Sequence, residues 1–292
     1  MRFARLSIAL LTISLLLAGC ATRRLTQFNT FAQAGITYTT ASQTVITDAG
    51  NATVSADSAL LIKSRPDLEE SKRRAYVTES DTKLRQRLQV LQLISAHGRV
   101  LQAYFQALAS LSDPKATNTV GTAAAGVYDS FAKISPDLKN AKMGATSVSS
   151  FIPTVTAPIV AIFKVHALND ELKLRAKPIA DELALQQAAF SAIASEFKTD
   201  AQELQNLQEA DSINQFATST ALPANWASSR LTLLSTPVTV ASADAAAKAA
   251  DQLSKAWAAL VADKLDSSGF TILMGDISNI LTIAQTIQSA GK

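Results

Sequence analysis

The chain has 292 residues, of which 48% are hydrophobic, 17% charged and 6% aromatic, and its formal net charge is +3. So apolar a chain is not disordered, its single cysteine excludes a disulfide scaffold, and its 10 glycines and 8 prolines exclude a collagen-like fold. Two histidines and one cysteine are a poor ligand set, so we expect no metal and no other cofactor.

The N-terminus has the pattern of an export signal. Two basic residues, Arg2 and Arg5, precede the uncharged apolar run 6–17, which is followed by the small residues 18–20. A basic start, a short apolar run and small residues at a cleavage point are typical of a secretory signal peptide. The run is too short to span a bilayer, which takes roughly 20 apolar residues.

The tetrapeptide Leu17-Ala18-Gly19-Cys20 resembles the lipobox of bacterial lipoproteins, and this resemblance covers residues 1–20 only. It implies that residues 1–19 are cleaved as a lipoprotein signal peptide. It also implies that the sulfur and the new amine of Cys20 carry fatty acids such as palmitate. Two or three acyl chains hold a protein at a membrane stably, whereas one chain is marginal. An ordinary signal peptide with a chance cysteine is the other interpretation.

Processing at Cys20 changes the charge and bears on the location. Without Arg2 and Arg5, 25 basic residues face 24 acidic ones, so the net charge falls to about +1 and gives no reason to expect a nucleic-acid partner. Ala21 follows the cysteine, in place of the aspartate that retains lipoproteins in the inner membrane of enteric bacteria. By this resemblance we expect residues 20–292 to lie in the cell envelope, on the periplasmic face of the outer membrane.

Residues 28–59 carry the seam of a packed helix. Apolar or small residues recur at alternating steps of three and four, which is the spacing of a coiled-coil seam. The seam consists of Phe28, Phe31, Gly35, Tyr38, Ser42, Val45, Ala49, Ala52, Ala56 and Ala59. Because many of these residues are small, we expect a partner helix to approach closely. Residues 64–67 interrupt the helix, and Pro66 suits the first turn of the next one.

The second predicted helix, residues 67–111, has the clearest amphipathic pattern. Charged and amide side chains cover one face, and the apolar face holds Leu84, Leu88, Leu91, Ile94, Gly98, Leu101, Phe105 and Leu108. Such a helix would be about 65 Å long at 1.5 Å per residue. A compact globule rarely contains so long a rod, so we expect an elongated bundle.

A third long helix is predicted over residues 165–210, which carry another apolar stripe. Pro178 lies inside this range. Its ring removes one backbone hydrogen bond and clashes with the preceding turn, so we expect a kink or a break there.

The C-terminal part of the chain is predicted to hold two shorter helices, over residues 242–264 and 270–289. The prolines near both ends of residues 222–238 indicate a connector, with a short extended piece at 231–234. No strand ladder is expected elsewhere. The predicted fold class is all-α: one elongated antiparallel helical bundle, with long and partly heptad-patterned helices, over residues 20–292.

The stretch from Met143 to Phe163 contains no charged residue: MGATSVSSFIPTVTAPIVAIF. Its length could cross a bilayer, but Pro153 and Pro158 would break a simple helix. We therefore expect a buried apolar connector or core helix within the bundle. The other interpretation is a hairpin that inserts into membranes. An apolar excursion midway along a rod-like bundle is similar in outline to α-helical pore-forming toxins, although this resemblance rests on no motif and those toxins have no lipid anchor.

Residues that could carry chemistry are few, and we predict no catalytic site. His97, beside the apolar face of the second helix, and His166 are each expected to be structural. The carboxylate pairs Glu69-Glu70 and Asp170-Glu171 are adjacent in sequence, so they point in different directions from a helix. No zinc-protease, serine-hydrolase, phosphate-binding or dinucleotide-binding motif occurs.

Two further features each have two interpretations. The basic residues at positions 72–74 and at 83, 85 and 87 are interleaved with acidic ones, which favours a mixed solvated surface over a site for phosphate-rich lipid headgroups. Trp226 and Trp257 are either core residues or interface anchors, and their spacing does not decide between these roles.

These observations predict a lipid-anchored envelope protein that acts as a non-enzymatic structural, scaffold or partner-binding helical module. Its partners would be the membrane, through the acyl chains on Cys20, and an unidentified protein of the envelope. The alternative is a membrane-active, pore-forming-like protein that uses residues 143–163. An enzyme without a recognisable motif, such as a glycosidase with two carboxylates far apart in sequence, is the third interpretation.

Overall fold

The computed structural model describes residues 2–111, 142–143, 146–147, 168–222, 224, 226–262, 264 and 267–290. Its elements in these ranges are α1 (Arg2–Ser64), the 3₁₀ turn η1 (Arg65–Asp67), α2 (Glu70–Leu111), β1 (Lys142–Met143), β2 (Thr146–Ser147), α4 (Leu168–Thr218), α5 (Trp226–Val261) and α6 (Ser267–Ala290). The two short strands pair antiparallel. Long helices make up nearly all of the described chain, which confirms the all-α prediction. Most of residues 143–163, together with His166, falls outside the described residues.

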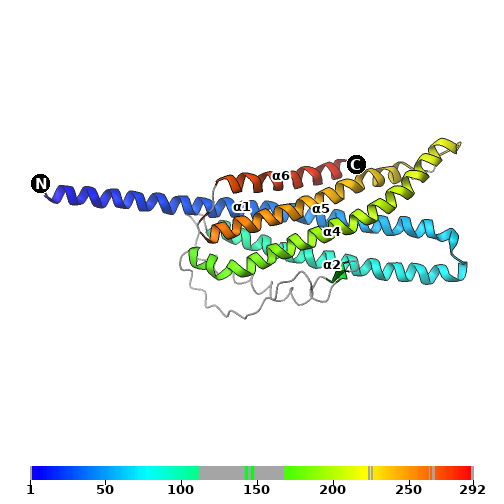
Figure 1. Ribbon diagram of the computed structural model, residues 1–292, viewed down its shortest axis with the longest axis horizontal. Coiled ribbons are helices and arrows are strands. Elements are labelled where there is room, and N and C mark those ends of the chain that lie inside the picture. The colour runs from blue at the N-terminus through cyan, green and yellow to red at the C-terminus, as the bar shows by residue number, and fades with distance from the viewer. Residues whose placement is uncertain are drawn as a thin grey trace.

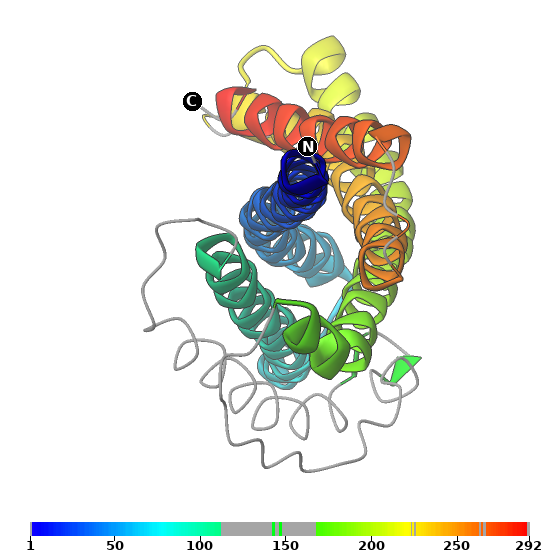
Figure 2. The ribbon, with the colours of Figure 1, turned by 90° about the vertical axis from the view of Figure 1, so that its left-hand side faces the viewer.

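The helices form two antiparallel hairpins and one added helix (Figure 1). α1 packs against α2, α4 packs against α5, and α6 packs onto α5 and α1. Since α1 also contacts α4 and α5, it runs through the middle of the assembly, as the end-on view in Figure 2 shows. The 42 residues of α2 span about 63 Å at 1.5 Å per residue, which confirms an elongated bundle.

The two ends of the bundle differ. At one end, α1 begins beyond the other helices (Figure 1). At the opposite end lie both hairpin turns, one between α1 and α2 and the other between α4 and α5. We call this second end the turn end. Pro66 lies there in η1, in the first turn after the helix break, as predicted.

The predicted seam of α1 faces the core and lets α2 approach closely. Eight of its ten residues are buried, and Ala52 and Ala59 are partly buried. A Cβ atom added at Gly35 would lie only 2.5 Å from Cγ of Phe105 on α2. A Cβ at Gly98 of α2 would also lie 2.5 Å from Nε2 of Gln43, but that atom is the end of a flexible side chain and can move aside. Gly35, which faces a buried ring, therefore sets the spacing of the α1–α2 hairpin.

An aromatic cluster joins the two hairpins in the core. The ring of Phe31 lies 5.6 Å from that of Phe105, edge to face, and 5.5 Å from that of Trp257 on α5. Tyr104 packs edge to face against the same tryptophan at 6.1 Å. The indole nitrogen of Trp257 donates a hydrogen bond of 2.9 Å to the carbonyl oxygen of Ala176 on α4. Trp257 is therefore a core residue that contacts three other helices.

Of the kink or break expected at Pro178, the break does not occur. α4 runs without interruption from Leu168 to Thr218, with the proline inside it. A proline in a helix interior costs about 3 kcal/mol relative to alanine. Burial of Leu172, Ile179 and Leu183 around it offsets this cost, since each fully buried Leu or Ile side chain contributes about 1.5–3 kcal/mol.

The connector expected over residues 222–238 is much shorter than predicted. α5 already begins at Trp226 and continues through residues 231–234, which the sequence predicts to be extended, and through Pro237. The preceding helix is also longer than predicted: α4 ends at Thr218, whereas the sequence predicts an end near residue 210. Pairing between α4 and α5 along their length explains the difference, since packing overrides local helix propensity.

Candidate functional site

The predicted lipidation site lies at the end of the bundle opposite the turn end. Leu17, Ala18, Gly19 and Cys20 belong to the N-terminal part of α1, whose side chains, up to residue 25, are outside the described set. Lipidation of Cys20 therefore stays a prediction. The same holds for the role of residues 143–163 and of His166, and the side chains of Asp170 and Glu171 are likewise not described.

His97 lies in a buried polar cluster that links α2 to α4. Its Nδ1 atom is 2.7 Å from Oε2 of Glu182 on α4, and Nε2 of Gln186 donates a hydrogen bond of 2.9 Å to Oε1 of the same carboxylate. His97 is 2% exposed and Glu182 5% exposed. Both carboxylate oxygens are thus engaged by side chains of the bundle itself, so the cluster is suited to holding α2 against α4.

Tyr38 of α1 lies near enough for the charge of Glu182 to act on it. Burial raises the pKa of its hydroxyl far above the usual value, the neighbouring Ser42 side chain opposes the rise, and the charge of Glu182 adds to it. Because the phenol stays protonated over the whole physiological range, it provides no nucleophile or base. Glu182 and Gln186 were missed by sequence reasoning, since nothing local marks a partner 85 residues from His97.

A second carboxylate is buried between α5 and α6. Asp276 is 8% exposed and forms an ion pair with Lys248, in which Oδ1 of the aspartate lies 3.0 Å from Nζ of the lysine. Asp276 is the only charged residue among the 24 of α6. The pair adds to the packing of the buried Leu273, Ile277 and Ile280, which holds the last helix on the bundle.

A hollow of about 820 Å³ lies along the outer part of α2, near the turn end. We call it the α2 groove, and its described lining is Ser71, Arg74, Ala75, Thr78, Glu79, Thr82, Lys83 and Gln86. These residues form two rows in which every step is four residues, and the rows are three residues apart, so they share one face of the helix. Most of them are polar residues, but the surface that they turn towards the groove is mainly that of their carbon atoms, so the α2 groove combines an apolar floor with charged groups such as Arg74, Glu79 and Lys83.

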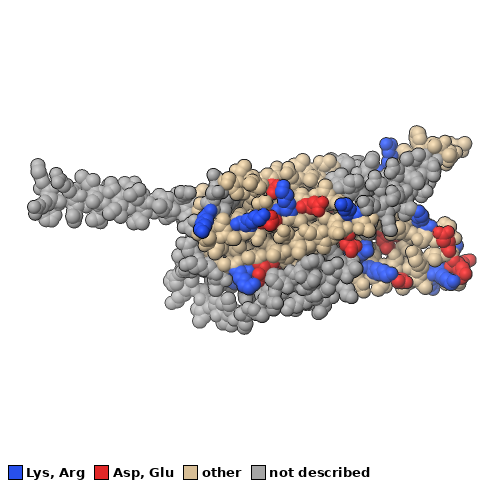
Figure 3. Space-filling model, viewed as in Figure 1, with Lys and Arg blue, Asp and Glu red and all other residues tan. Residues whose placement is uncertain are grey.

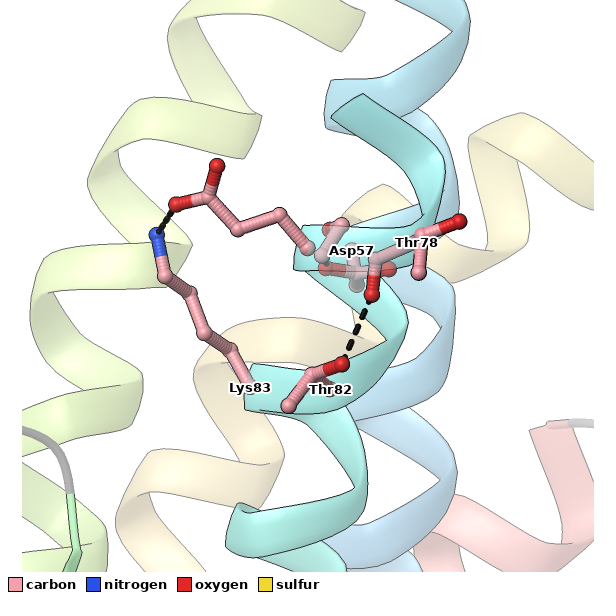
Figure 4. A network of polar contacts seen from close by, with 6 residues as sticks. Asp57, Thr78, Thr82 and Lys83 are labelled. Carbon is pink, nitrogen blue, oxygen red and sulfur yellow. Dashed lines mark hydrogen bonds and ion pairs between the residues drawn. The ribbon is translucent and has the colours of Figure 1, made fainter. Parts of the chain in front are cut away.

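Polar contacts within the α2 groove are shown in Figure 4. Nζ of Lys83 lies 2.7 Å from Oε1 of Glu79, and the hydroxyl of Thr82 donates a hydrogen bond of 2.8 Å to the carbonyl oxygen of Thr78. The hydrogen bond and the charge of Lys83 lower the pKa of Glu79, and the same contacts with Glu79 raise the pKa of Lys83. Both groups are therefore charged at neutral pH. Near them, the hydroxyl of Ser80 on α2 donates a hydrogen bond to Oδ1 of Asp57 on α1, which links the two helices.

Trp226 forms an exposed aromatic stack where α4 turns into α5. Its ring lies 5.7 Å from that of Phe216, which is 68% exposed, and the guanidinium carbon of Arg230 lies 5.6 Å from the centre of the indole. The tryptophan thus contacts both a ring and a cation, each of which contributes about 0.5–1 kcal/mol at an exposed site. This arrangement makes Trp226 an anchor for the second hairpin turn.

Charged side chains of both signs are interleaved on the face shown in Figure 3. Among the described residues, oppositely charged side chains also form surface pairs, such as Lys177 with Asp181 at 2.6 Å and Lys255 with Asp251 at 2.6 Å. Glu69 pairs with Lys72 in the same way, at 2.9 Å. The mixed solvated surface that the sequence predicts is therefore present. The described part of this face offers no large patch of a single sign.

Asp48 of α1 is a partly buried carboxylate. Its Oδ2 atom is buried and accepts no hydrogen bond within the described chain, and burial raises the pKa of the group above its usual value. The folded state therefore binds this proton more tightly than the unfolded state. The free energy of unfolding should fall as the pH rises from about 4 through the folded-state pKa.

We accordingly expect Asp48→Asn to stabilise the protein at pH 7 and to have little effect below about pH 4. Urea denaturation of both chains at the two pH values measures this difference. The exposed Asp67 gives the matched control, because Asp67→Asn removes the same charge without a buried oxygen. An equal gain from the two variants would contradict a desolvation effect at Asp48.

In the ranges that the structure describes, no three His, Cys, Asp or Glu residues gather to hold a metal ion. None of the helices in those ranges is both long and apolar enough to cross a bilayer. Comparison with protein-family models, with curated proteins and with solved structures finds no match for this chain. A function must therefore be inferred from the geometry of the chain itself.

Proposed function

We propose that this protein is a lipid-anchored structural or partner-binding module of the bacterial cell envelope. Acyl chains on Cys20 would hold it at the periplasmic face of the outer membrane, and a protein partner would bind along the bundle. The observation that carries this proposal is the position of the α2 groove relative to Cys20. The groove lies near the turn end, whereas the lipobox lies in the part of α1 that begins beyond the other helices.

The long helix α1 would act as a spacer between the membrane and the α2 groove. From Cys20 to Ser64 the helix covers about 66 Å at 1.5 Å per residue. A bilayer with its headgroups is about 40–45 Å thick, so the spacer is longer than a membrane is deep. The α2 groove would thus be presented well away from the anchoring surface.

The internal chemistry of the bundle agrees with a non-enzymatic role. The buried ionisable groups His97, Glu182 and Asp276 each contact a side chain of a neighbouring helix. The charged residues of the α2 groove, Glu79 and Lys83, pair with each other and are 66% and 69% exposed. These groups are used for packing and for surface charge.

Cys20→Ser tests the anchor. We expect the wild type to incorporate labelled palmitate and to sediment with membranes, and we expect the variant to lose both properties, because a hydroxyl cannot form the thioether. Ala21→Ser is the matched control, since it changes the next residue and leaves the thiol. Labelling that persists in Cys20→Ser, or a wild type without label, would contradict the proposal.

A photo-reactive amino acid tests the binding half of the proposal. At the exposed Thr78, inside the α2 groove, we expect a discrete cross-link to another envelope protein in living cells. Gln106, exposed on α2 outside the groove, is the control. Cross-linking at Gln106 and not at Thr78 would move the binding surface away from the groove.

A further inference from the structure

The outer side of α1 carries a second heptad pattern, opposite its core seam. It starts at Thr26 and ends at Ser58, and its steps alternate between four and three residues. We call these ten positions the outer stripe: Thr26, Thr30, Gln33, Thr37, Thr40, Thr44, Thr47, Asn51, Val54 and Ser58. Eight of the ten side chains are exposed, and Thr37 and Thr44 are half-buried. Figure 2 shows the side of α1 between α2 and α6 without another coloured helix over it.

No residue of the outer stripe is charged. Its composition is threonine, glutamine, asparagine and serine with one valine, whereas the exposed faces of α2 and α5 carry many charges. The hydroxyls of Thr30, Thr37 and Thr47 donate hydrogen bonds of 2.9–3.0 Å to backbone carbonyls of α1 itself. These threonines therefore need no outside partner for their hydroxyls and can present their methyl groups.

A strict alternation of three and four is the spacing that lets two helices stay in contact along their length. An uncharged seam can face an identical copy of itself without repulsion between like charges. The two nearest carboxylates, Asp48 and Asp57, flank the outer stripe. In a parallel pair of α1 helices they would face Gln43 and Ile62 of the other copy, so no two carboxylates would meet.

The area available fits a weak interface. From Thr26 to Ser58 the stripe is about 48 Å long, and a helix is about 10 Å wide, so two copies would bury about 1,000 Å² in total. That is the lower limit for a specific interface. Two chains tethered to one bilayer have a high effective concentration, which raises the occupancy of a weak contact without any new interaction.

We infer that the outer stripe of α1 binds the outer stripe of a second copy of this chain, in parallel, when both copies are anchored in one membrane. The parallel direction rests on the proposed lipid anchor, because two helices that leave the same surface from Cys20 point the same way. The contact itself rests on the spacing, exposure and lack of charge of the stripe.

Cysteine cross-linking in the lipidated full-length chain tests this inference, since acylation of Cys20 removes the only natural thiol. We expect both Thr30→Cys and Asn51→Cys to give disulfide-linked dimers in membranes. The yield should be at least about fivefold that of Ser195→Cys, an exposed position on α4, because only stripe positions bring the two sulfurs within bonding distance. Equal yields at all three positions, or a cross-link to a different protein, would overturn the inference.

The direction of pairing is tested in the same membranes. In a parallel pair, each position of one copy faces the same position of the other copy, so a cysteine cross-links to its own equivalent. An antiparallel pair in which Thr26 faces Ser58 would instead cross-link Thr30→Cys chains to Val54→Cys chains and neither to itself, which would overturn the inference. Adding Gln33→Glu, which changes charge but not shape, should lower the yield of the Asn51→Cys dimer at low salt and restore it at high salt. No change on adding that charge would also count against the stripe.

Palmitate labelling of the same samples separates the two proposals. Labelled chains that do not dimerise would overturn the inference and leave the anchor in place. If the chain carries no label, the anchor fails, and the stripe is then tested with purified Cys20→Ser protein at high concentration. In that background the yield of disulfide-linked dimer from Thr30→Cys should still exceed the yield from Ser195→Cys. Equal yields would overturn the inference on their own.

Discussion

Glu182→Ala is expected to lower the free energy of unfolding by about 3–5 kcal/mol, because it leaves His97 buried without its carboxylate partner. Gln186 would lose its acceptor at the same time. For a protein of this size the loss corresponds to a fall in Tm of about 6–20 °C. Thermal unfolding followed by far-UV circular dichroism measures it. A change below about 1 kcal/mol would show that the cluster is not tightly packed.

Two controls separate the buried pair from the loss of a charge. Glu196→Ala removes a carboxylate from the same helix, but this one lies 3.6 Å from Arg87 at the surface, so the cost should stay below about 1 kcal/mol. The double variant His97→Phe/Glu182→Leu replaces the pair with apolar side chains and should recover most of the lost stability. A double variant as unstable as Glu182→Ala would instead point to a packing defect.

Gly35→Ala is expected to destabilise the protein by about 1–3 kcal/mol, although alanine is the better helix former by about 1 kcal/mol. The new methyl group would lie 2.5 Å from Cγ of Phe105, an aromatic ring that is itself fully buried, so α1 and α2 would have to move apart. Urea denaturation measures the loss. Adding Phe105→Leu should reverse part of it, because the ring that blocks the methyl is gone.

Gly275→Ala is the matched control for this prediction. It makes the same change on α6, where a Cβ atom would meet nothing within 4 Å. Only the helix propensity then remains, so we expect a gain of up to about 1 kcal/mol. Losses of equal size at both glycines would contradict the role of Gly35 in the spacing of the α1–α2 hairpin.

The helices that the sequence predicts well are those whose burial follows their own periodicity. In α1 and α2 the apolar residues recur every three or four positions, so the buried face can be read locally. Prolines mislead where neighbouring helices decide the outcome. α4 continues through Pro178 and α5 through residues 231–238, since pairing of these two helices outweighs the local cost.

The contacts of the candidate sites are harder to predict from the sequence. His97 and Glu182 are 85 residues apart, and no local pattern indicates that they meet. The residues that line the α2 groove share one face of α2, but their sequence does not show that this face is hollowed. The outer stripe of α1, by contrast, is visible in the sequence as spacing, but only the structure shows that its side chains are exposed.

The continuity of α1 has a mechanical consequence. This one helix carries Cys20 and also contacts α2, α4, α5 and α6. Tension applied through the proposed lipid anchor would therefore act along its axis, parallel to its interfaces with the other helices. Such a load shears many side-chain contacts together, and contacts that are individually weak resist strongly in parallel. Tension applied at the C-terminus would act on α6, which lies on the outside of the bundle (Figure 2), and would peel it away one turn at a time.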